Sequence, residues 1–215
     1  MTVPGEDERA PRMSAGARRR RAEILLAARE VFTTRGFRGG SLGEIAERVG
    51  ITHQGVLHYF GTKERLLVEV LADRDLEGAS SSAQLSGAGF LTHLVDTVRL
   101  NTTRSGIVQA YTVLSAESVT DGHPAQEWFR QRFAGLRSEV REALREIGEP
   151  DVADAELERG AAAVIGVMDG LQVQWLLDPG AVDMPATLRT VINGLLAGWG
   201  RPPLPDERGA LDSRS

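Results

Sequence analysis

Apolar side chains recur at helical spacing along almost the whole chain, and this periodicity restricts the possible folds most strongly. In an amphipathic helix the apolar positions fall three or four residues apart, so that they form one stripe. The stripe of the first predicted helix, over residues 16–35, consists of Ile24, Leu25, Ala28, Val31 and Phe32. We find no segment with the alternating pattern of a half-buried β-strand. The sequence therefore predicts an all-α protein.

Glycine and proline mark where the predicted helices end. Gly36 follows the first helix and Gly50 ends a short second one, and glycine is the usual residue at a left-handed helix stop. The clusters DGHP, GEP and DPG separate the helices of the C-terminal part. These helices are predicted over residues 90–103, 107–119, 124–147, 152–177 and 184–199. Residues 1–15 and 201–215 are predicted to be a disordered arm and a disordered tail.

Charge is unevenly distributed along the chain. The whole sequence has a net charge of −5 at pH 7. Residues 1–66 hold 12 basic and 8 acidic side chains, whereas residues 67–215 hold 13 basic and 22 acidic ones. A basic N-terminal third on an acidic body favours local contact with a polyanion such as nucleic acid. Chance asymmetry is the alternative, and the charge alone does not decide between them.

Composition excludes several other kinds of protein. The chain contains no cysteine, which excludes a disulfide framework and thiolate metal sites. The N-terminal segment lacks the apolar run of a secretory signal, and no stretch approaches the roughly 18 apolar residues that span a bilayer. We therefore expect a cytoplasmic protein without a membrane partner. His123 and Glu127 have chelating spacing, but Pro124 begins that helix, and we predict no metal site.

The segment SLGEIAERVGITHQGVLHYF contains two short helices joined by a tight turn. Ser41 and Glu44 form a capping box at the start of the first helix, and Thr52 can cap the second. Ala46 allows the two helices to cross closely, while Gly50 turns the chain sharply between them. This combination predicts a helix-turn-helix.

The second helix of this pair has an apolar face and a polar face. Its apolar face consists of Val56, Leu57 and Phe60, which we expect to be buried. Its polar face presents groups that can reach base edges and phosphates in a DNA major groove, namely His53, Gln54, Gly55, His58 and Tyr59. We interpret this face as a DNA-binding surface. The alternative is a small helical domain whose polar face meets only solvent.

Over the same region the sequence resembles the TetR family of transcriptional regulators. The resemblance rests on VFTTRGFRGG followed by SLGEIAERVGITHQGVLHYFGTKERLL. It implies a homodimer whose two recognition helices bind a pseudo-palindromic double-stranded DNA operator. It also implies a DNA-binding domain over residues 16–62 and, over residues 63–200, a helical domain that holds a small-molecule effector and the dimer contact.

Individual positions match residues with known roles in that family. Ser41 and Thr52 match helix-start residues that contact phosphates. The positions that face the bases are those of His53, Gln54 and Gly55.

Two further positions concern phosphate contact. Leu57 stands where many family members have a phosphate-binding tyrosine, so that contact is expected to be lost unless Tyr59 or His58 replaces it. Lys63 matches a phosphate anchor, and it is the only lysine among 25 basic residues. A positive charge in the first turn of a helix is mildly unfavourable to the helix dipole. Phosphate contact would explain this lysine, and drift is the alternative.

The remaining predictions concern the C-terminal domain. A pocket for a hydrophobic or partly aromatic effector is predicted among Phe90, His93, Tyr111, Trp128, Phe133, Met168, Gln172 and Trp175. The predicted dimer interface joins a helix with small residues to an apolar stripe on the last helix, namely Ala162, Gly166, Gly170, Leu188, Val191, Ile192, Leu195 and Trp199. An intramolecular core is the alternative for the small-residue face.

The predicted function is that of a ligand-responsive transcriptional regulator, more specifically a repressor, without a cofactor. Two other classes are open. One is an all-α enzyme or small-molecule carrier whose N-terminal helices are only structural, although no nucleophile, base and acid occur together at helical spacing. The other is a constitutive DNA-binding protein without an effector.

Overall fold

The computed structural model describes residues 13–82, 84–148 and 151–205, with the side chains of residues 74–82 excepted. These residues form nine α-helices and no β-strand, which confirms the all-α prediction. In chain order the helices are α1 (Ala15–Gly39), α2 (Leu42–Arg48), α3 (His53–Phe60), α4 (Lys63–Ser82), α5 (Gly87–Asn101), α6 (Ser105–Glu117), α7 (Gln126–Gly148), α8 (Asp154–Leu177) and α9 (Met184–Gly198).

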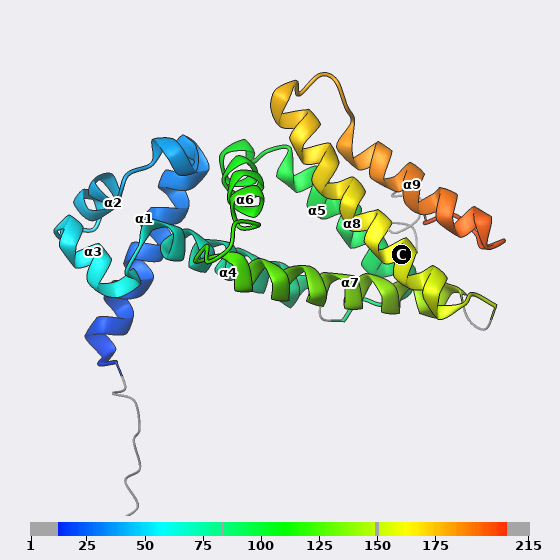
Figure 1. Cartoon of the computed structure of the whole chain (residues 1–215), viewed down its shortest axis with the longest axis horizontal. Helices are drawn as coiled ribbons and strands as arrows, with labels where there is room; N and C mark the ends of the chain where they lie inside the picture. The colour runs from blue at the N-terminus through cyan, green and yellow to red at the C-terminus, as the bar shows by residue number, and fades with distance from the viewer. Residues whose placement is uncertain (1–12, 83, 149–150, 206–215) are drawn as a thin grey trace, which may run out of the picture.

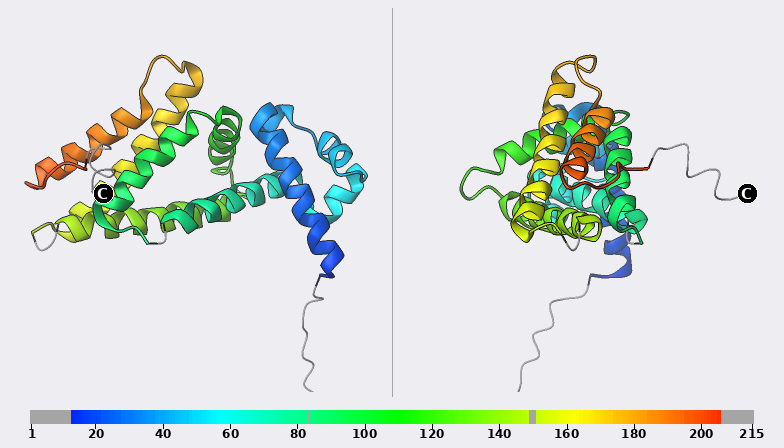
Figure 2. Two further views of the ribbon diagram at one scale, coloured as in Figure 1. Left: turned by 180° about the vertical axis from the view of Figure 1, so that it is seen from behind. Right: turned by 90° about the vertical axis from the view of Figure 1, so that its right-hand side faces the viewer.

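The molecule is elongated, with three helices at one end and four at the other (Figure 1). The first end holds α1, α2 and α3, and the second holds α5, α7, α8 and α9 (Figures 1 and 2). Helices α4 and α6 lie between them, and both pack against α1. The arrangement is an N-terminal helix-turn-helix domain followed by a larger helical domain, as the sequence predicts.

One apolar core fills the helix-turn-helix end. Its buried residues include Ile24 and Phe32 of α1, Ile45 of α2 and Val56 of α3. The same core continues without a break into α4, α6 and the first turns of α7, whose contributions are Leu66, Leu67, Val70, Leu71, Ile107, Ala110, Tyr111, Leu114, Ala125 and Phe129. The apolar packing therefore extends well past residue 62, where the sequence analysis divided the domains.

Helix α6 crosses α1 at a position where only glycine fits. A methyl group added to Gly106 would lie 1.6 Å from the carbonyl oxygen of Thr33 in α1. No side chain can occupy that distance, so the two backbones are in direct contact. This crossing is a rigid joint between the helix-turn-helix end and the rest of the molecule.

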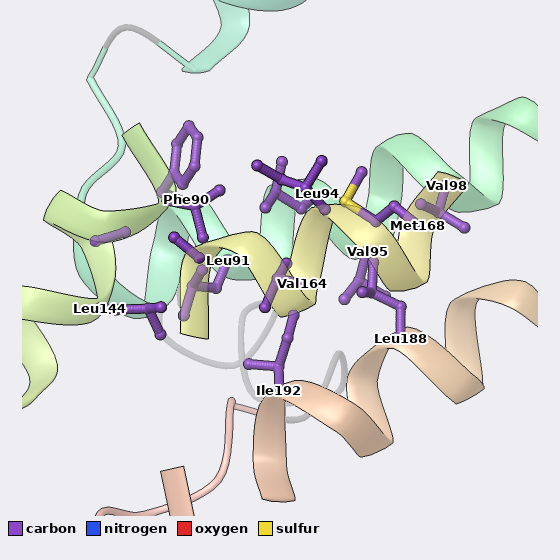
Figure 3. Packing of buried hydrophobic residues seen from close by; sticks show 14 of the residues in the cluster. Phe90, Leu91, Leu94, Val95, Val98, Leu144, Val164, Met168, Leu188 and Ile192 are labelled. Carbon is purple, nitrogen blue, oxygen red and sulfur yellow. The ribbon is translucent and has the colours of Figure 1, made fainter. Parts of the chain in front are cut away.

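A second apolar core joins α5, α7, α8 and α9. Figure 3 shows its centre, where Val95 of α5, Val164 of α8 and Ile192 of α9 approach one another. Phe133 of α7 packs against both this core and the first one. The two cores therefore meet at Phe133.

The helices begin and end close to the glycine and proline residues that predicted their boundaries, with small shifts. Gly36 has a positive φ of 67° and kinks α1, at the position where the sequence predicts its end. Helix α7 begins at Gln126, two residues after Pro124. Helix α5 begins at Gly87, three residues earlier than predicted. The N–H groups of Gly89 and Phe90 donate to the carbonyl oxygen of Ser86, and these hydrogen bonds form the extra first turn.

Residues 201–205 are not a disordered tail, which corrects the expectation for this segment. Leu204 is buried, and its backbone N–H donates to Asn193 Oδ1 at 2.9 Å. Arg201 Nη2 lies 2.8 Å from Asp151 Oδ2 and donates to the carbonyl oxygen of Gly148. One buried leucine and this arginine tie the segment to α7 and α9. The predicted arm before residue 13 and the tail beyond residue 205 lie outside the described residues.

Helix α8 is long and apolar enough to cross a membrane by length and composition, contrary to the expectation from the sequence. In the structure it packs between α7 and α9, and 44% of its most apolar window is buried. A core helix of a soluble protein meets the same criteria, because the apolar side chains that it buries also give it a high mean hydropathy. The packing of α8 is that of a core helix.

Candidate functional site

The turn between α2 and α3 is fixed by backbone hydrogen bonds. Gly50 has a positive φ of 65°, a conformation that glycine adopts without steric cost. The N–H of Ile51, the next residue, donates to the carbonyl oxygen of Ala46 at 3.0 Å. These contacts hold α3 at a set angle to α2, as a helix-turn-helix requires.

Hydroxyl side chains cap the helices of this unit. Ser41 Oγ accepts from the N–H of Glu44 at 3.0 Å, and Thr52 Oγ1 accepts from the N–H of Gly55 at 3.0 Å. Thr62, which the sequence analysis did not single out, caps α4 in the same way at 3.1 Å from the N–H of Arg65. Each hydroxyl keeps its own O–H as a donor, which a phosphate oxygen can accept.

Helix α3 presents the polar face that the sequence predicts. Thr52, His53, Gln54 and His58 are exposed. Val56 and Phe60 are buried in the first core, while Leu57 and Tyr59 are half-buried against it. The ring of Tyr59 contacts the rings of His58 and Phe60, with centroids 5.7 Å and 6.5 Å away. The tyrosine is therefore partly a packing residue, and the exposed groups lie at the start of the helix.

Gly55 is not required by the fold. A methyl group added there would lie 3.4 Å from Thr52 Oγ1 and 3.5 Å from Ile51, which are ordinary van der Waals distances. Glycine in a helix costs about 1 kcal/mol relative to alanine. The absence of a side chain at this half-exposed position therefore needs a reason outside the folded chain, and close approach of DNA is one.

Lys63 lies in the first turn of α4 against an aromatic ring of α1. Its ammonium group is 4.6 Å from the centroid of Phe37, a cation–π distance. Partial burial lowers the pKa of Lys63, and the carboxylate of Glu64 opposes that effect. The lysine is thus positioned by the helix-turn-helix end itself, with its charge held at the start of α4.

Two arginines of the basic segment 18–21 contact other parts of the chain. Arg20 donates to the carbonyl oxygen of Val49 at 2.9 Å, which caps the end of α2. Arg21 pairs with Glu69 and lies 5.0 Å from the centre of the Phe60 ring. These side chains hold α1 against α2, α3 and α4.

The residues predicted to line an effector pocket fall into two regions. Tyr111, Trp128 and Phe133 surround Phe129, with ring centroids 5.3, 4.7 and 6.1 Å from it. The others lie on α5 and α8, where Phe90, Met168, Gln172 and Trp175 are buried and His93 is half-buried. Of the eight, Trp175 lines a cavity of about 680 Å³ at the α8–α9 connection. One common pocket for all eight stays a prediction.

The residues predicted for the dimer interface differ in how far they are buried within the chain. Leu188 and Ile192 are fully buried and point from α9 into the second core (Figure 3), so neither can contact another chain in this fold. Trp199 is half-buried and packs on Gly160 of α8. Val191, Leu195 and Gly170 are half-buried, whereas Ala162 and Gly166 are exposed.

Two exposed apolar residues of α8 were missed from the sequence. Val173 is 45% exposed and Leu177 is 83% exposed. They follow Gly166 and Gly170 with alternating spacings of four, three and four residues, so all four share one face of α8. That spacing is visible in the sequence and could have identified them.

The described residues contain no group of three or more histidine, cysteine, aspartate or glutamate side chains that could hold a metal ion.

The polar groups of α3 are spread along one exposed helix face, which suits contact with an extended partner. A double-stranded DNA groove is such a partner.

Comparison with known proteins relates the chain to bacterial regulators. Residues 24–70 match the family described as bacterial regulatory proteins, tetR family. Residues 93–198 match the C-terminal domain of BetI-type transcriptional repressors. The two matches follow each other along the chain, separated by residues 71–92, and together cover most of it.

Relatives of known function and a solved structure agree with these matches. The chain is 25% identical to the HTH-type transcriptional regulator AcrR of Shigella flexneri over 191 residues, 84% of this chain and 89% of AcrR. It is 35% identical to the HTH-type transcriptional repressor AcnR of Corynebacterium jeikeium over 51 residues, 24% of this chain and only 27% of AcnR. A transcriptional regulator from Rhodococcus sp. RHA1 has the same fold, with a TM-score of 0.67, 24% identity, and coverage of 83% of this chain and 96% of that one. With a helix-turn-helix at one end and a helical domain that matches at the other, the chain belongs to the TetR family of transcriptional regulators.

Proposed function

We propose that this TetR-family regulator is a repressor that binds a pseudo-palindromic operator as a homodimer and is released by a small-molecule effector. The observation that carries the DNA-binding part is the start of α3, where Thr52, His53 and Gln54 are exposed on a capped helix. An exposed amide such as that of Gln54 can make two hydrogen bonds to an adenine edge in the major groove. This activity places the protein in the cytoplasm, where the DNA is.

The exposed face of α8 supports the homodimer. Gly166 and Gly170 have open space around them, because an added methyl group would meet no atom within 4 Å. Val173 and Leu177 continue that face with exposed apolar surface. Small residues permit close approach of a second helix, and apolar ones favour burial. We therefore assign the dimer contact to this face and leave out the buried Leu188 and Ile192.

The effector is proposed to be a hydrophobic or partly aromatic small molecule. Its site lies in the helical domain after α4, because a ligand there can move α6 and, through the tight contact at Gly106, α1. Two alternatives are a regulator without an effector and an all-α enzyme or carrier. The match of 84% of the chain to the regulator AcrR argues against the latter, and a search for compounds that release DNA would test the former.

The DNA-binding part is tested by selecting an operator from random duplexes and measuring binding by fluorescence anisotropy. Gln54→Ala should change the preferred base at one position of each half-site, at a cost of roughly 1–3 kcal/mol. Gln84→Ala, at an exposed glutamine before α5, is the matched control and should leave affinity and preference unchanged. Identical base preferences for wild type and Gln54→Ala would refute the assignment of α3 as the recognition helix.

A further inference from the structure

A cavity of about 680 Å³ that is largely open to solvent lies where α5 ends and α9 begins. It is bounded by the last turn of α5, the end of α8, the α8–α9 connection and the first turns of α9. Figure 1 shows this connection at the far end of α8 from α7's last turn. The volume falls within the range of about 300–1,000 Å³ that is common for small-molecule sites.

One side of the cavity is apolar. Trp175 of α8 is 8% exposed and Met184 of α9 is fully buried, and both contribute to the lining. Val182 and Pro185 add two more apolar side chains from the connection and from α9. A tryptophan and a methionine offer a broad and adaptable surface for a hydrocarbon or an aromatic ring.

The rim of the cavity carries more positive than negative charge. Arg99 of α5 and Arg189 of α9 both line it, and Asp183 is its only acidic lining residue in the described chain. Arg99 also pairs with Asp96, one turn earlier in α5, which is not among the lining residues. The carboxylate of Asp183 already accepts the N–H of Ala186 at 3.0 Å as the cap of α9. Arg189 donates to the carbonyl oxygen of Pro205 at 3.0 Å, which holds its guanidinium in place. A guanidinium presents five donors in a planar fork that matches a carboxylate.

We infer that this cavity binds an amphipathic carboxylate, with its apolar body against Trp175 and Met184 and its carboxylate between Arg99 and Arg189. It is the effector site of the regulator, and this assignment rests on the proposed function. The two arginines add a requirement for negative charge to the hydrophobic effector expected from the aromatic residues.

The cavity borders the turn that leads into α6, and α6 packs against α1 of the helix-turn-helix end. Thr102, which lines the cavity, belongs to the short turn that joins α5 to α6. Two residues into α6, Gly106 meets the backbone of α1 without space for a methyl group. A ligand that moves the end of α5 would therefore move α6 and α1 together, since a joint this tight transmits displacement rather than absorbing it.

The proposed dimer contact leaves the cavity accessible. Residues two apart on a helix point about 200° away from each other. Trp175 therefore faces the opposite side of α8 from Val173 and Leu177. A second chain on the face of Val173 and Leu177 would not cover the side on which Trp175 lines the cavity.

The site is tested by isothermal titration calorimetry of the full chain with decanoate and with 2-naphthoate. Decanol and 2-naphthamide are the uncharged controls. Arg189→Gln and Arg99→Gln should each weaken carboxylate binding roughly ten-fold, the effect of one charge-assisted hydrogen bond. Arg137→Gln, at an exposed arginine of α7, makes the same charge change away from the cavity and should bind as wild type does. Arg99 is exposed, so its variant remains informative if Arg189→Gln fails to fold.

The inference is overturned if neither carboxylate binds, if the uncharged controls bind equally well, or if both arginine variants bind like wild type. Operator binding is measured separately by anisotropy with and without the carboxylate. If the carboxylate binds in a way that depends on the arginines but does not change operator affinity, the cavity is a binding site but not the effector site. Loss of all operator binding in the unliganded protein would refute the proposed function, while calorimetry still decides on the site.

Discussion

Substitution of Gly55 tests two properties of α3, the proposed recognition helix, namely its stability and its approach to DNA. Because a methyl group fits at Gly55 with contacts no closer than 3.4 Å, we expect Gly55→Ala to raise the free energy of unfolding by up to about 1 kcal/mol. The same change should weaken operator binding, because the methyl group occupies the space next to DNA. Thermal unfolding and fluorescence anisotropy measure the two effects.

Gly135→Ala is the matched control, since Gly135 is an exposed glycine within α7 with no atom near an added methyl group. It should stabilise the protein to a similar extent and leave operator affinity unchanged. If Gly55→Ala binds the operator as tightly as Gly135→Ala does, the glycine has no role in DNA approach.

Lys63 is expected to contact a phosphate through the ammonium group that Phe37 positions. Lys63→Ala should therefore weaken binding to all DNA sequences and lower the slope of log affinity against log salt concentration by about one. Lys63→Arg keeps the charge and should restore most of the slope. Titrations at several salt concentrations measure it, and an unchanged slope in Lys63→Ala would show that no phosphate is lost.

Local contacts in this site could be predicted from the sequence, and long-range ones could not. The caps at Ser41 and Thr52 join residues three positions apart, so their spacing already specifies them. The contact of Lys63 with Phe37 depends on how α4 packs against the end of α1. That geometry is decided by the whole core, and no pattern near either residue encodes it.

At the scale of helices, Asp169 of α8 is a half-buried carboxylate whose pKa shift affects stability. Burial raises the pKa of Asp169 to about 6 from 3.8, and the positive charge of Arg132 on α7 offsets part of the rise. The folded state therefore holds this proton more tightly than the unfolded state. The stability that protonation provides is complete below about pH 4 and is lost as pH rises through about 6.

Asp169→Asn keeps the shape of the neutral form, so it should be more stable than wild type at pH 8. The gain should be on the order of 2 kcal/mol there and should vanish near pH 4. Glu139→Gln makes the same kind of substitution at an exposed carboxylate of α7 and is the control for the chemical change itself. Chemical denaturation at both pH values measures these differences. An Asp169→Asn gain that is the same at both pH values would contradict the assignment.

The positions of the helices could be predicted, because helix-breaking residues and apolar periodicity are local features of the sequence. Which neighbour each apolar face packs against could not be predicted. The sequence shows that Leu188, Val191, Ile192 and Leu195 lie along one side of α9. Only the position of α5 and α8 decides that Leu188 and Ile192 are covered within the chain (Figure 3). A stripe of this kind fits an internal core and a dimer contact equally well.

At the scale of the molecule, the two cores are joined rather than independent. Phe133 packs on both, and Gly106 brings α6 into backbone contact with α1. The helix-turn-helix end therefore cannot rotate without moving α6. A regulator needs such a joint, because a ligand can change DNA affinity only if the two arrangements differ in free energy and are connected.

The proposed homodimer concerns the whole molecule and can be tested with a single side chain. Leu177 is 83% exposed on the face of α8 assigned to the dimer, so Leu177→Arg should not disturb the fold of one chain. It would bury an unpaired charge between two chains, which costs several kcal/mol. We expect sedimentation velocity to show a monomer at micromolar concentration. Operator affinity should fall as well. Two separate monomers must then bind the two half-sites independently, whereas in a dimer the binding of one subunit holds the other near its half-site.

Val119→Arg is the matched control for this experiment. Val119 is 79% exposed, close to the value for Leu177, but it lies in the connection after α6 and away from the α8 face. The same substitution there adds the same charge and removes a similar apolar surface, so it corrects for general effects on solubility and DNA affinity. Val119→Arg should remain a dimer with wild-type operator binding. A Leu177→Arg protein that still sediments as a dimer would move the contact off this face of α8, and the half-buried residues Val191 and Leu195 of α9 would be tested next.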